Sequence, residues 1–203
     1  MKCFLHVGCG PIYKDQIKGF NNEDWREIRF DIDESVNPDI IGTLTDMNSI
    51  ETGSMDAVYS SHNIEHIYPH EVQIALKEFY RVLKDDGMVV LTCPDLQRAC
   101  EAVVNDKLTE TLYKTSGGYP ITPMDILYGW RGPLKKGNHY MAHKTGFTAK
   151  LLYSFFADAG FKSHGVARRT EAYELYGYAV KNKEISNKEI AKELEKHSEA
   201  NVL

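Results

Sequence analysis

Three polar stretches, each directly after an apolar run, hold the residue types that could do chemistry. They are residues 8–10, residues 31–33 and residues 61–66. Glycines after a strand let a ligand approach the backbone, and a carboxylate after the next strand can accept hydrogen bonds from a ribose diol. Gly8, Gly10 and Asp31 meet both requirements. The first two stretches therefore predict a nucleoside-binding site, and the third adds groups that can transfer protons.

The residues that follow the glycines narrow the class of ligand. A dinucleotide-binding loop has the pattern Gly-x-Gly-x-x-Gly, and here Tyr13 stands at the position of the third glycine. The chain also lacks a glycine-rich loop that ends in Gly-Lys-Ser or Gly-Lys-Thr. A pyrophosphate is therefore a poor fit, and a phosphate-binding P-loop is excluded.

The third stretch, His62-Asn63-Ile64-Glu65-His66, also matches the H-x-x-E-H pattern of inverted zinc peptidases. That chemistry requires a helix and a third ligand, whereas this stretch follows a predicted strand. His139 and His143, four residues apart, form a second pair that keeps a metal site open. Histidines so placed are more often hydrogen-bonded without a metal, so we expect none. A zinc-dependent hydrolase using His62, Glu65 and His66 is kept as an alternative.

The elements that position these residues alternate along the chain. Short apolar runs predict strands at residues 3–7, 27–30, 39–43, 55–60, 88–92, 165–168 and 175–180. Helical spacing or end signals predict helices at residues 12–18, 70–83 and 149–159. Such alternation predicts a doubly wound, mainly parallel α/β sheet, in which ligands bind beyond the carboxyl ends of the strands.

Two segments stand outside this alternation. Residues 95–146 are expected to form an irregular insertion over the active face. Its aromatic and basic residues are candidates for lining a substrate pocket or gripping an anion: Tyr119, Tyr128, Trp130, Arg131, Lys135, Lys136 and Tyr140. Residues 183–203 are a charged tail, and Ser186 with Glu189 forms a capping-box pattern that predicts a solvated helix. The domain proper is thus expected at residues 1–182.

Composition limits the remaining possibilities. With 203 residues, 42% hydrophobic content and a net charge of −5, the chain suits one globular domain without a basic nucleic-acid footprint. Its four cysteines show no C-x-x-C spacing, and its N-terminal apolar run is too broken for a signal peptide. We therefore expect a cytoplasmic protein with no membrane span and with nucleic acid unlikely as a partner. Nothing here predicts the oligomeric state.

Four motifs in a fixed order resemble the class I S-adenosylmethionine-dependent methyltransferases, in particular small type 11 methyltransferase domains. The motifs are residues 5–10, 29–33, 45–47 together with 55–66, and 79–87. The resemblance covers residues 3–95 well and residues 143–168 loosely. It implies a seven-stranded Rossmann-like sheet and S-adenosylmethionine as the cofactor.

The resemblance also assigns cofactor-binding residues. They are Gly8, Cys9, Gly10, Asp31, Ile32, Asp46, Met47, Ser61 and His62. By this likeness the glycines pass under the methionine part and Asp31 takes the ribose hydroxyls. Asp46 accepts from the adenine amino group, and the backbone N–H of Met47 faces the ring. Ser61 and His62 border the methyl donor.

Two positions depart from the family pattern. His6 stands where an acidic residue is usual, and Ile12 stands where a third glycine is usual. The first helix also looks truncated. Asp33 could share the work of Asp31, because both bracket the same strand end. These departures motivate a second alternative, a non-catalytic module that binds S-adenosylmethionine.

The expected reaction is direct in-line displacement of the methyl group, which needs alignment rather than a covalent enzyme nucleophile. The expected acceptor is an oxygen or nitrogen of a small molecule, for example a sugar or sugar-phosphate. If that atom must lose a proton, the candidate general bases are His62, His66, His139 and His143. Glu65 could orient one of them.

Overall fold

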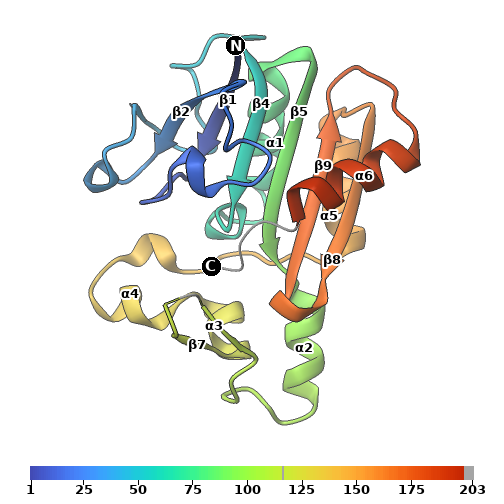
Figure 1. Ribbon diagram of the computed structural model, residues 1–203. Helices are drawn as coiled ribbons and strands as arrows, with labels where there is room; N and C mark the ends of the chain where they lie inside the picture. Colours follow the sequence, from blue (N-terminus) through green and yellow to red (C-terminus); the bar gives the residue numbers. More distant parts are fainter. Residues whose placement is uncertain (116, 199–203) are drawn as a thin grey trace.

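A seven-stranded sheet forms the centre of the protein in the computed structural model, which describes residues 1–115 and 117–198 (Figure 1). Its strand order is β3-β2-β1-β4-β5-β9-β8. The strands are β1 (Lys2–Val7), β2 (Trp25–Asp31), β3 (Ile40–Ile41), β4 (Met55–Ser61), β5 (Leu83–Pro94), β8 (Ser163–Arg169) and β9 (Glu174–Val180). The predicted strands are therefore confirmed, with β3 shorter and β5 longer than expected.

The direction of the strands brings the three polar stretches together. β3, β2, β1, β4 and β5 are parallel, whereas β9 is antiparallel to both of its neighbours. The chain moves outward from β1 to β3 and then returns to β4 on the other side of β1, which makes a switch point between β1 and β4. Ligands of open α/β sheets bind at such a point, beyond the carboxyl ends. All three stretches lie at that edge.

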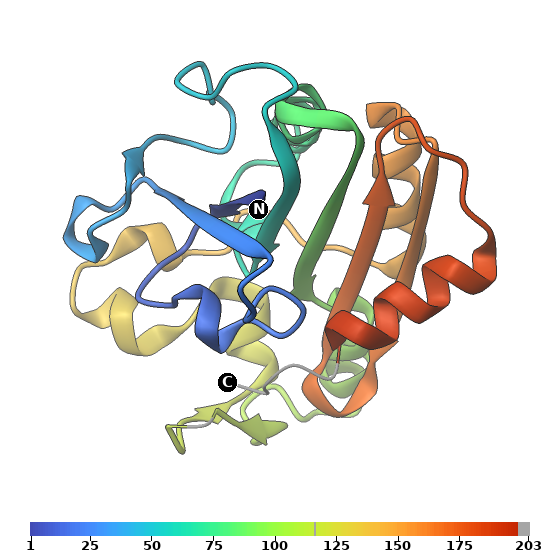
Figure 2. The same ribbon diagram turned by 45° about the horizontal axis from the view of Figure 1, so that its top comes forward.

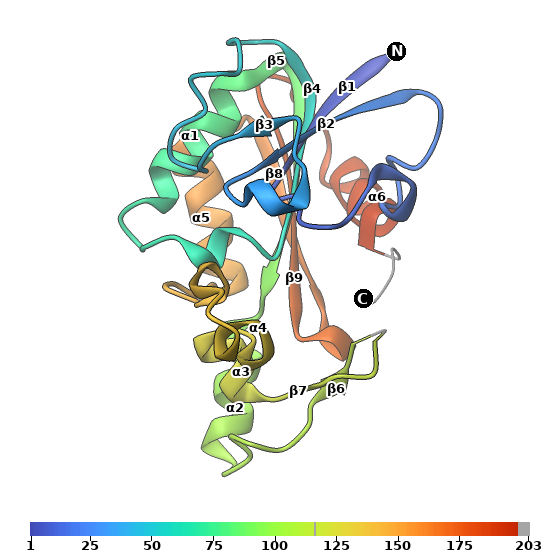
Figure 3. The same ribbon diagram turned by 90° about the vertical axis from the view of Figure 1, so that its left-hand side faces the viewer.

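Helices cover both faces of the sheet. α1 (Val72–Val82) and α5 (Ala149–Ala159) pack on one face, and α6 (Asn187–Ser198) lies on the other (Figure 3). The predicted apolar stripe of α1 is fully buried, as Val72, Leu76 and Phe79 illustrate. The central strand β5 is covered on both faces, because alternate residues join the core cluster on either side of the sheet.

The predicted helix at residues 12–18 is wrong. Only a single 3-10 turn forms there, at Lys14–Gln16. The backbone of Tyr13 is extended instead of helical. The backbone N–H groups of Tyr13 and Lys14 donate to side chains instead of to carbonyls of a helix. The Tyr13 N–H donates to Gln16 (3.1 Å) and the Lys14 N–H to Glu27 on β2 (3.0 Å). Pro11 therefore does not start a helix here.

The insertion is more regular than expected and lies below the carboxyl ends of β1, β4 and β5 in Figure 1. It contains α2 (Leu96–Val104), the short hairpin β6 (Tyr113–Lys114) and β7 (Pro120–Ile121), α3 (Pro123–Tyr128) and α4 (Arg131–Lys135). Ala99, Ile121 and Ile126 form a small core of its own, against which Trp130 packs. The Asp95 side chain caps α2 by accepting from the Gln97 N–H. A segment that lacks sheet periodicity is thus still folded.

The C-terminal helix is not solvated on all sides, contrary to expectation. α6 crosses the β8–β9 hairpin (Figure 2) and buries Ile190, Leu194 and His197. The His197 ring contacts Phe20, with ring centroids 5.3 Å apart. Part of the predicted tail, residues 199–203, lies outside the described residues. Within the described ranges, no helix is long and apolar enough to cross a membrane.

Candidate functional site

The glycine loop has the conformation that its residue types predict. Gly8 and Gly10 have φ angles of +68° and +49°, in the region that favours glycine. A Cβ on Gly8 would lie 2.2 Å from the Asn63 amide, whereas a Cβ on Gly10 would meet nothing within 4 Å. The loop is therefore packed at its first glycine and open at its second.

Asp31 lies at the centre of this loop. Its Oδ2 accepts from the Gly10 N–H (2.8 Å) and its Oδ1 from the Asp33 N–H (2.9 Å). Each carboxylate oxygen keeps a second lone pair, so a ribose diol can still be bound. The Asp33 side chain turns instead to the Ser35 N–H. Asp31, rather than Asp33, is therefore positioned for a ligand.

Ile32, which follows Asp31, and Cys9, which lies between the two glycines, differ in how exposed their side chains are. Ile32 is 43% exposed, so its side chain can cover a ligand bound at the strand end. Cys9 is buried, and this burial raises the pKa of its thiol to about 12. Its side chain thus belongs to the core, and only its backbone lies along the loop.

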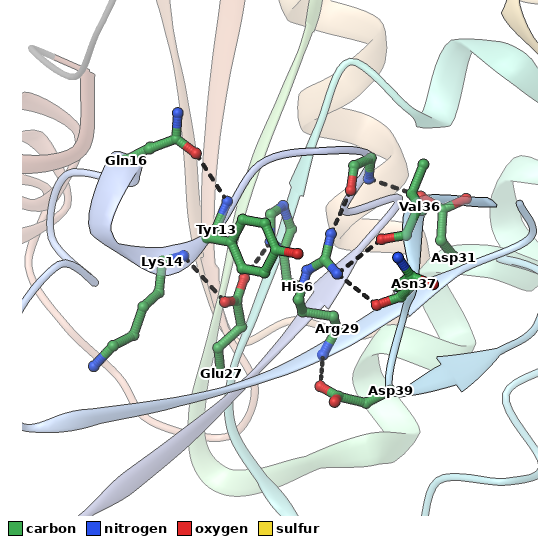
Figure 4. Close-up of polar contacts among 11 residues, drawn as sticks. His6, Tyr13, Lys14, Gln16, Glu27, Arg29, Asp31, Val36, Asn37 and Asp39 are labelled. Carbon is green, nitrogen blue, oxygen red and sulfur yellow. Dashed lines mark hydrogen bonds and ion pairs between the residues drawn. The ribbon is translucent and has the colours of Figure 1, made fainter. Parts of the chain in front are cut away.

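Arg29 braces the loop, a role that the sequence did not suggest. Its guanidinium donates to the carbonyls of Gly10, Val36 and Asn37. Figure 4 shows this guanidinium beside the Tyr13 ring, whose centroid lies 4.1 Å from the Arg29 Cζ. The loop after β1 is thereby tied to the turn after β2.

The same close-up explains the unusual His6. The His6 Nδ1 lies 2.6 Å from the Glu27 carboxylate on β2 (Figure 4). Glu27 also accepts from the Lys14 N–H, so it joins β1 to the 3-10 turn. The His6 side chain is therefore held by a structural contact with the neighbouring strand.

The Met47 backbone N–H, which was expected to face adenine, already has a partner within the protein. The Met47 N–H donates to the Glu78 carboxylate of α1 (2.9 Å), and its side chain is fully buried. Arg81 holds the same loop by donating to the Met47 carbonyl. Asp46 is exposed and accepts from the Asn48 N–H, which is the turn-capping role that an Asp often takes.

A cavity of about 310 Å³ opens beyond the carboxyl ends of β4 and β5. Ser61, the last residue of β4, and His62, which follows it, line the cavity. Trp130 and His143 line it from the insertion, and other residues line it from the β8–β9 hairpin. Ile12, two positions after Gly10, also lines it. The cavity therefore adjoins the glycine loop without including it.

His62 stands at the sheet edge of this cavity in a left-handed backbone conformation, with φ +47°. Such a conformation is rare for a residue with a side chain and is found often at functional sites. Its Nε2 lies 2.6 Å from Glu174, the first residue of β9, and its Nδ1 lies 3.6 Å from Glu65. Burial opposes the charge on His62, but the two carboxylates prevail and raise its pKa to about 10.

Glu65, His66 and His143 meet beside His62. The Lys144 and Thr145 N–H groups donate to the Glu65 carbonyl, which fixes this segment against the turn after β4. The rings of His66 and His143 lie edge to face, with centroids 4.9 Å apart. Burial lowers the pKa of His143, so its ring is neutral near pH 7. Burial acts to raise the pKa of Glu65, yet the neighbouring imidazoles hold it below its usual value.

The other predicted site residues are divided between the cavity and the surface. His139 lies exposed on a 3-10 turn (His139–Met141), so the expected pair with His143 does not form a site. Trp130 lines the cavity, whereas Tyr119, Tyr128 and Tyr140 are more than half exposed. Arg131 forms an ion pair with Asp125 at 2.6 Å, and Lys135 and Lys136 are exposed. The basic loop therefore does not form an anion clamp at the cavity.

The comparison with known families agrees with this arrangement. Residues 5–91 match a family model described as a methyltransferase domain. This match contains the glycine loop, Asp31 and the stretch that follows β4. A search of the curated proteins finds no match.

Solved structures share the fold. A protein from Pyrococcus horikoshii OT3 aligns with a TM-score of 0.58 at 14% identity, covering 89% of this chain and 82% of that chain. A SAM dependent methyltransferase from Archaeoglobus fulgidus gives 0.55 at 15% identity, with 89% and 86% covered. An O-methyltransferase family protein from Burkholderia thailandensis gives 0.56 at 9% identity, with 91% and 52% covered. At these identities the likeness establishes the fold.

Proposed function

We propose that the chain is a class I S-adenosylmethionine-dependent methyltransferase and that it methylates an oxygen or nitrogen of a small molecule bound in the cavity beside β4. The observation that carries the proposal is the continuity of the site. The cavity begins at Ser61 and His62, where the resemblance puts the methyl donor, and extends over two further imidazoles.

The residues at the strand ends fit the cofactor. Gly10 faces open space, and the Asp31 carboxylate is held by two backbone N–H groups with lone pairs left for the ribose hydroxyls. Ile12 and Gln16 follow the glycine loop in the sequence and line the cavity. The loop and the cavity are therefore adjacent, and a ligand with a nucleoside end and an amino-acid end needs two such adjacent sites. The cofactor supplies a methyl group that is already activated on a sulfonium sulfur.

The task left to the protein is alignment and proton management. Direct transfer needs the acceptor atom, the methyl carbon and the sulfur in one line, and holding them so can lower the barrier by several kcal/mol (about 7 or more in favourable cases). Ser61 and His62 are the cavity residues at the β4 end, so they border the proposed transfer path. No covalent bond to the protein is required.

His62 and His143 differ in their ability to accept a proton at neutral pH. His62 is a poor base at neutral pH, because its two carboxylate neighbours keep it protonated. It serves better as a fixed positive group that holds Glu65 and Glu174 in place. His143 is neutral near pH 7 and lines the cavity together with His66. We therefore assign acceptor activation to the side of the cavity that His66 and His143 form.

The walls of the cavity favour an uncharged, hydroxyl-bearing acceptor. Trp130 and Tyr113 supply aromatic surface on which a sugar ring can pack. Arg169, the arginine on the lining, lies 3.4 Å from Glu174, which favours a sugar over a sugar-phosphate. A volume near 310 Å³ is at the lower end for ligand sites and suits a small acceptor. The net charge of −5 weighs against nucleic acid.

The zinc-hydrolase alternative loses its support, because it needs His62 as a metal ligand. The His62 Nε2 is hydrogen-bonded to Glu174, and the match to the methyltransferase domain covers the same residues. All four cysteines are free, which supports our proposal of a reducing, cytoplasmic environment.

Titration calorimetry with S-adenosylmethionine and S-adenosylhomocysteine tests the cofactor site. We expect both to bind, Asp31→Asn to weaken both about tenfold or more, and the matched control Asp33→Asn to bind like the parent. No binding by the parent would contradict the proposal.

A methyl-labelling experiment tests the acceptor class. The protein is incubated with methyl-labelled S-adenosylmethionine and with either the low-mass or the macromolecular fraction of a cell extract. We expect label in the low-mass fraction and its loss in His143→Asn. Label confined to macromolecules would contradict a small-molecule acceptor, and cofactor binding without any transfer would favour the non-catalytic alternative.

A further inference from the structure

Three ligand-type atoms meet in the cavity wall, one each from Glu65, His66 and His143. All lie within 4.8 Å of one another. The residues come from two distant parts of the chain, because Glu65 and His66 follow β4 and His143 ends the insertion. Residues of these types are ligands of transition-metal ions.

The hydrogen bonds of the two histidines show which ring nitrogen is available. The His66 Nδ1 lies 3.1 Å from the Ala142 carbonyl, and the His143 Nδ1 lies 2.7 Å from the Ile126 carbonyl. A carbonyl oxygen only accepts, so both Nδ1 atoms carry the proton and donate it. In the neutral form of each ring, the lone pair is therefore on Nε2. This is the arrangement that orients histidine ligands in metal sites.

The Glu65 carboxylate is the second, independent sign of a missing partner. Its side chain is 1% exposed, and no described residue donates a hydrogen bond to either of its oxygens. The His62 Nδ1 is 3.6 Å away and the His143 Nε2 is 4.0 Å away. A buried carboxylate that accepts no hydrogen bond is costly, and the ion pair with His62 at 3.6 Å offsets this cost only in part. In their neutral form the His66 and His143 rings turn an Nε2 lone pair toward the same cluster, and a lone pair cannot donate. A cation satisfies all three groups at once.

We propose that Glu65, His66 and His143 bind one divalent transition-metal ion. Two imidazoles and one carboxylate favour Zn²⁺, Co²⁺, Fe²⁺ or Mn²⁺ over Ca²⁺ and Mg²⁺, which prefer oxygen ligands. Backbone carbonyls hold both rings, and the Lys144 and Thr145 N–H groups hold the Glu65 carbonyl. The site therefore needs only small side-chain movements to close on an ion.

This site gives the transferase a way to activate a hydroxyl, a consequence that rests on the proposed function. Three protein ligands leave open positions, and Glu65, His66 and His143 all line the cavity in which the acceptor is placed. A hydroxyl bound to the ion has a lowered pKa and releases its proton to solvent. The new oxygen–carbon bond then forms as the carbon–sulfur bond of the cofactor breaks.

Cobalt binding tests the site without reference to activity. The purified protein is treated with EDTA, desalted and titrated with Co²⁺ alone, and the visible d–d absorption is followed. We expect one Co²⁺ per chain, displaced by Zn²⁺. Glu65→Gln and His143→Asn should each weaken Co²⁺ binding at least about tenfold. The control His139→Asn, which changes an exposed histidine four residues away, should bind Co²⁺ like the parent.

Binding of S-adenosylmethionine is measured on the same samples to show that each variant is folded. A parent that binds neither Co²⁺ nor Zn²⁺ overturns the proposal, and so does equal loss of Co²⁺ binding in His139→Asn. If His62→Gln abolishes Co²⁺ binding while His143→Asn does not, the ligand set is wrong. A parent that binds Co²⁺ through these residues but not S-adenosylmethionine supports the metal site and contradicts the proposed function.

Discussion

His62 and Glu174 are hydrogen-bonded at 2.6 Å although 112 positions separate them in the sequence. His62 directly follows β4 and Glu174 begins β9, with β5 between these strands in the sheet. The pair therefore crosses the end of the central strand and ties the hairpin to the polar stretch. It also fixes the ring that separates Glu65 from Glu174.

A double-mutant cycle on this pair measures its strength. His62→Gln, Glu174→Gln and the double variant are unfolded with urea in EDTA at neutral pH. We expect a coupling free energy of about 2 kcal/mol, because a charged hydrogen bond next to a buried carboxylate is stronger than a surface pair. The exposed pair Lys107 and Glu110 is the control and should couple by less than about 0.5 kcal/mol. Equal coupling in the two cycles would contradict this prediction.

Arg29 offers a test of the loop that holds the cofactor. Arg29→Met leaves the carbonyls of Gly10, Val36 and Asn37 without their donor, so unfolding should become easier by about 2–4 kcal/mol. S-adenosylmethionine should bind more weakly in calorimetry, since Gly10 is no longer held.

The control for Arg29 lies on the same strand. Arg26 is exposed and its Nε contacts the Cys3 sulfur. Arg26→Met should change the free energy of unfolding by no more than about 0.5 kcal/mol and leave cofactor affinity unchanged. If both variants lose affinity equally, Arg29 has no special role in bracing the loop.

Local sequence patterns predicted those helices and strands whose own apolar residues pack in the core. The α1 stripe and the β5 run are confirmed because each of their apolar residues meets the sheet core. α6 was expected to be solvated because it begins at a capping-box pattern in a charged tail, yet its Ile190, Leu194 and His197 side chains are buried and dock it. The helix expected after Pro11 failed because Glu27, on another strand, takes the Lys14 N–H.

The site could be predicted only where it lies in one stretch of sequence. Gly8, Gly10 and Asp31 follow strand ends, and their geometry agrees with their residue types. The sequence did not mark Glu174 or Arg29 as site residues. Glu174 reaches His62 only because of the strand order, and Arg29 acts through backbone carbonyls of neighbouring turns. His143 was paired with the wrong partner, since spacing along the chain suggested His139 and the folded insertion brings it to Glu65.

The two loop glycines should respond differently to the same substitution. Both have positive φ, so Gly10→Ala should cost about 1 kcal/mol of stability through backbone strain alone. Gly8→Ala adds a contact of 2.2 Å with Asn63 and should cost about 2–3 kcal/mol. In the Gly8→Ala background, Asn63→Ala should recover part of the loss. Equal costs at both glycines in urea unfolding would show that Asn63 does not pack over Gly8.

The docking of α6 should depend on pH through His197. Burial, followed by the nearby Lys196 charge, lowers the pKa of His197 to about 4, from a usual value of 6.5. The unfolded chain therefore binds this proton more readily, so the contribution to stability is complete above pH 6.5 and is lost as the pH falls toward 4. Between pH 7.5 and pH 5 the loss should be about 2 kcal/mol. His197→Phe keeps a ring against Phe20 but cannot be protonated. In urea unfolding, the free energy of unfolding of this variant should therefore fall by about 2 kcal/mol less than that of the parent between pH 7.5 and pH 5. The same pH dependence in the parent and in His197→Phe would mean that His197 is not the group that titrates.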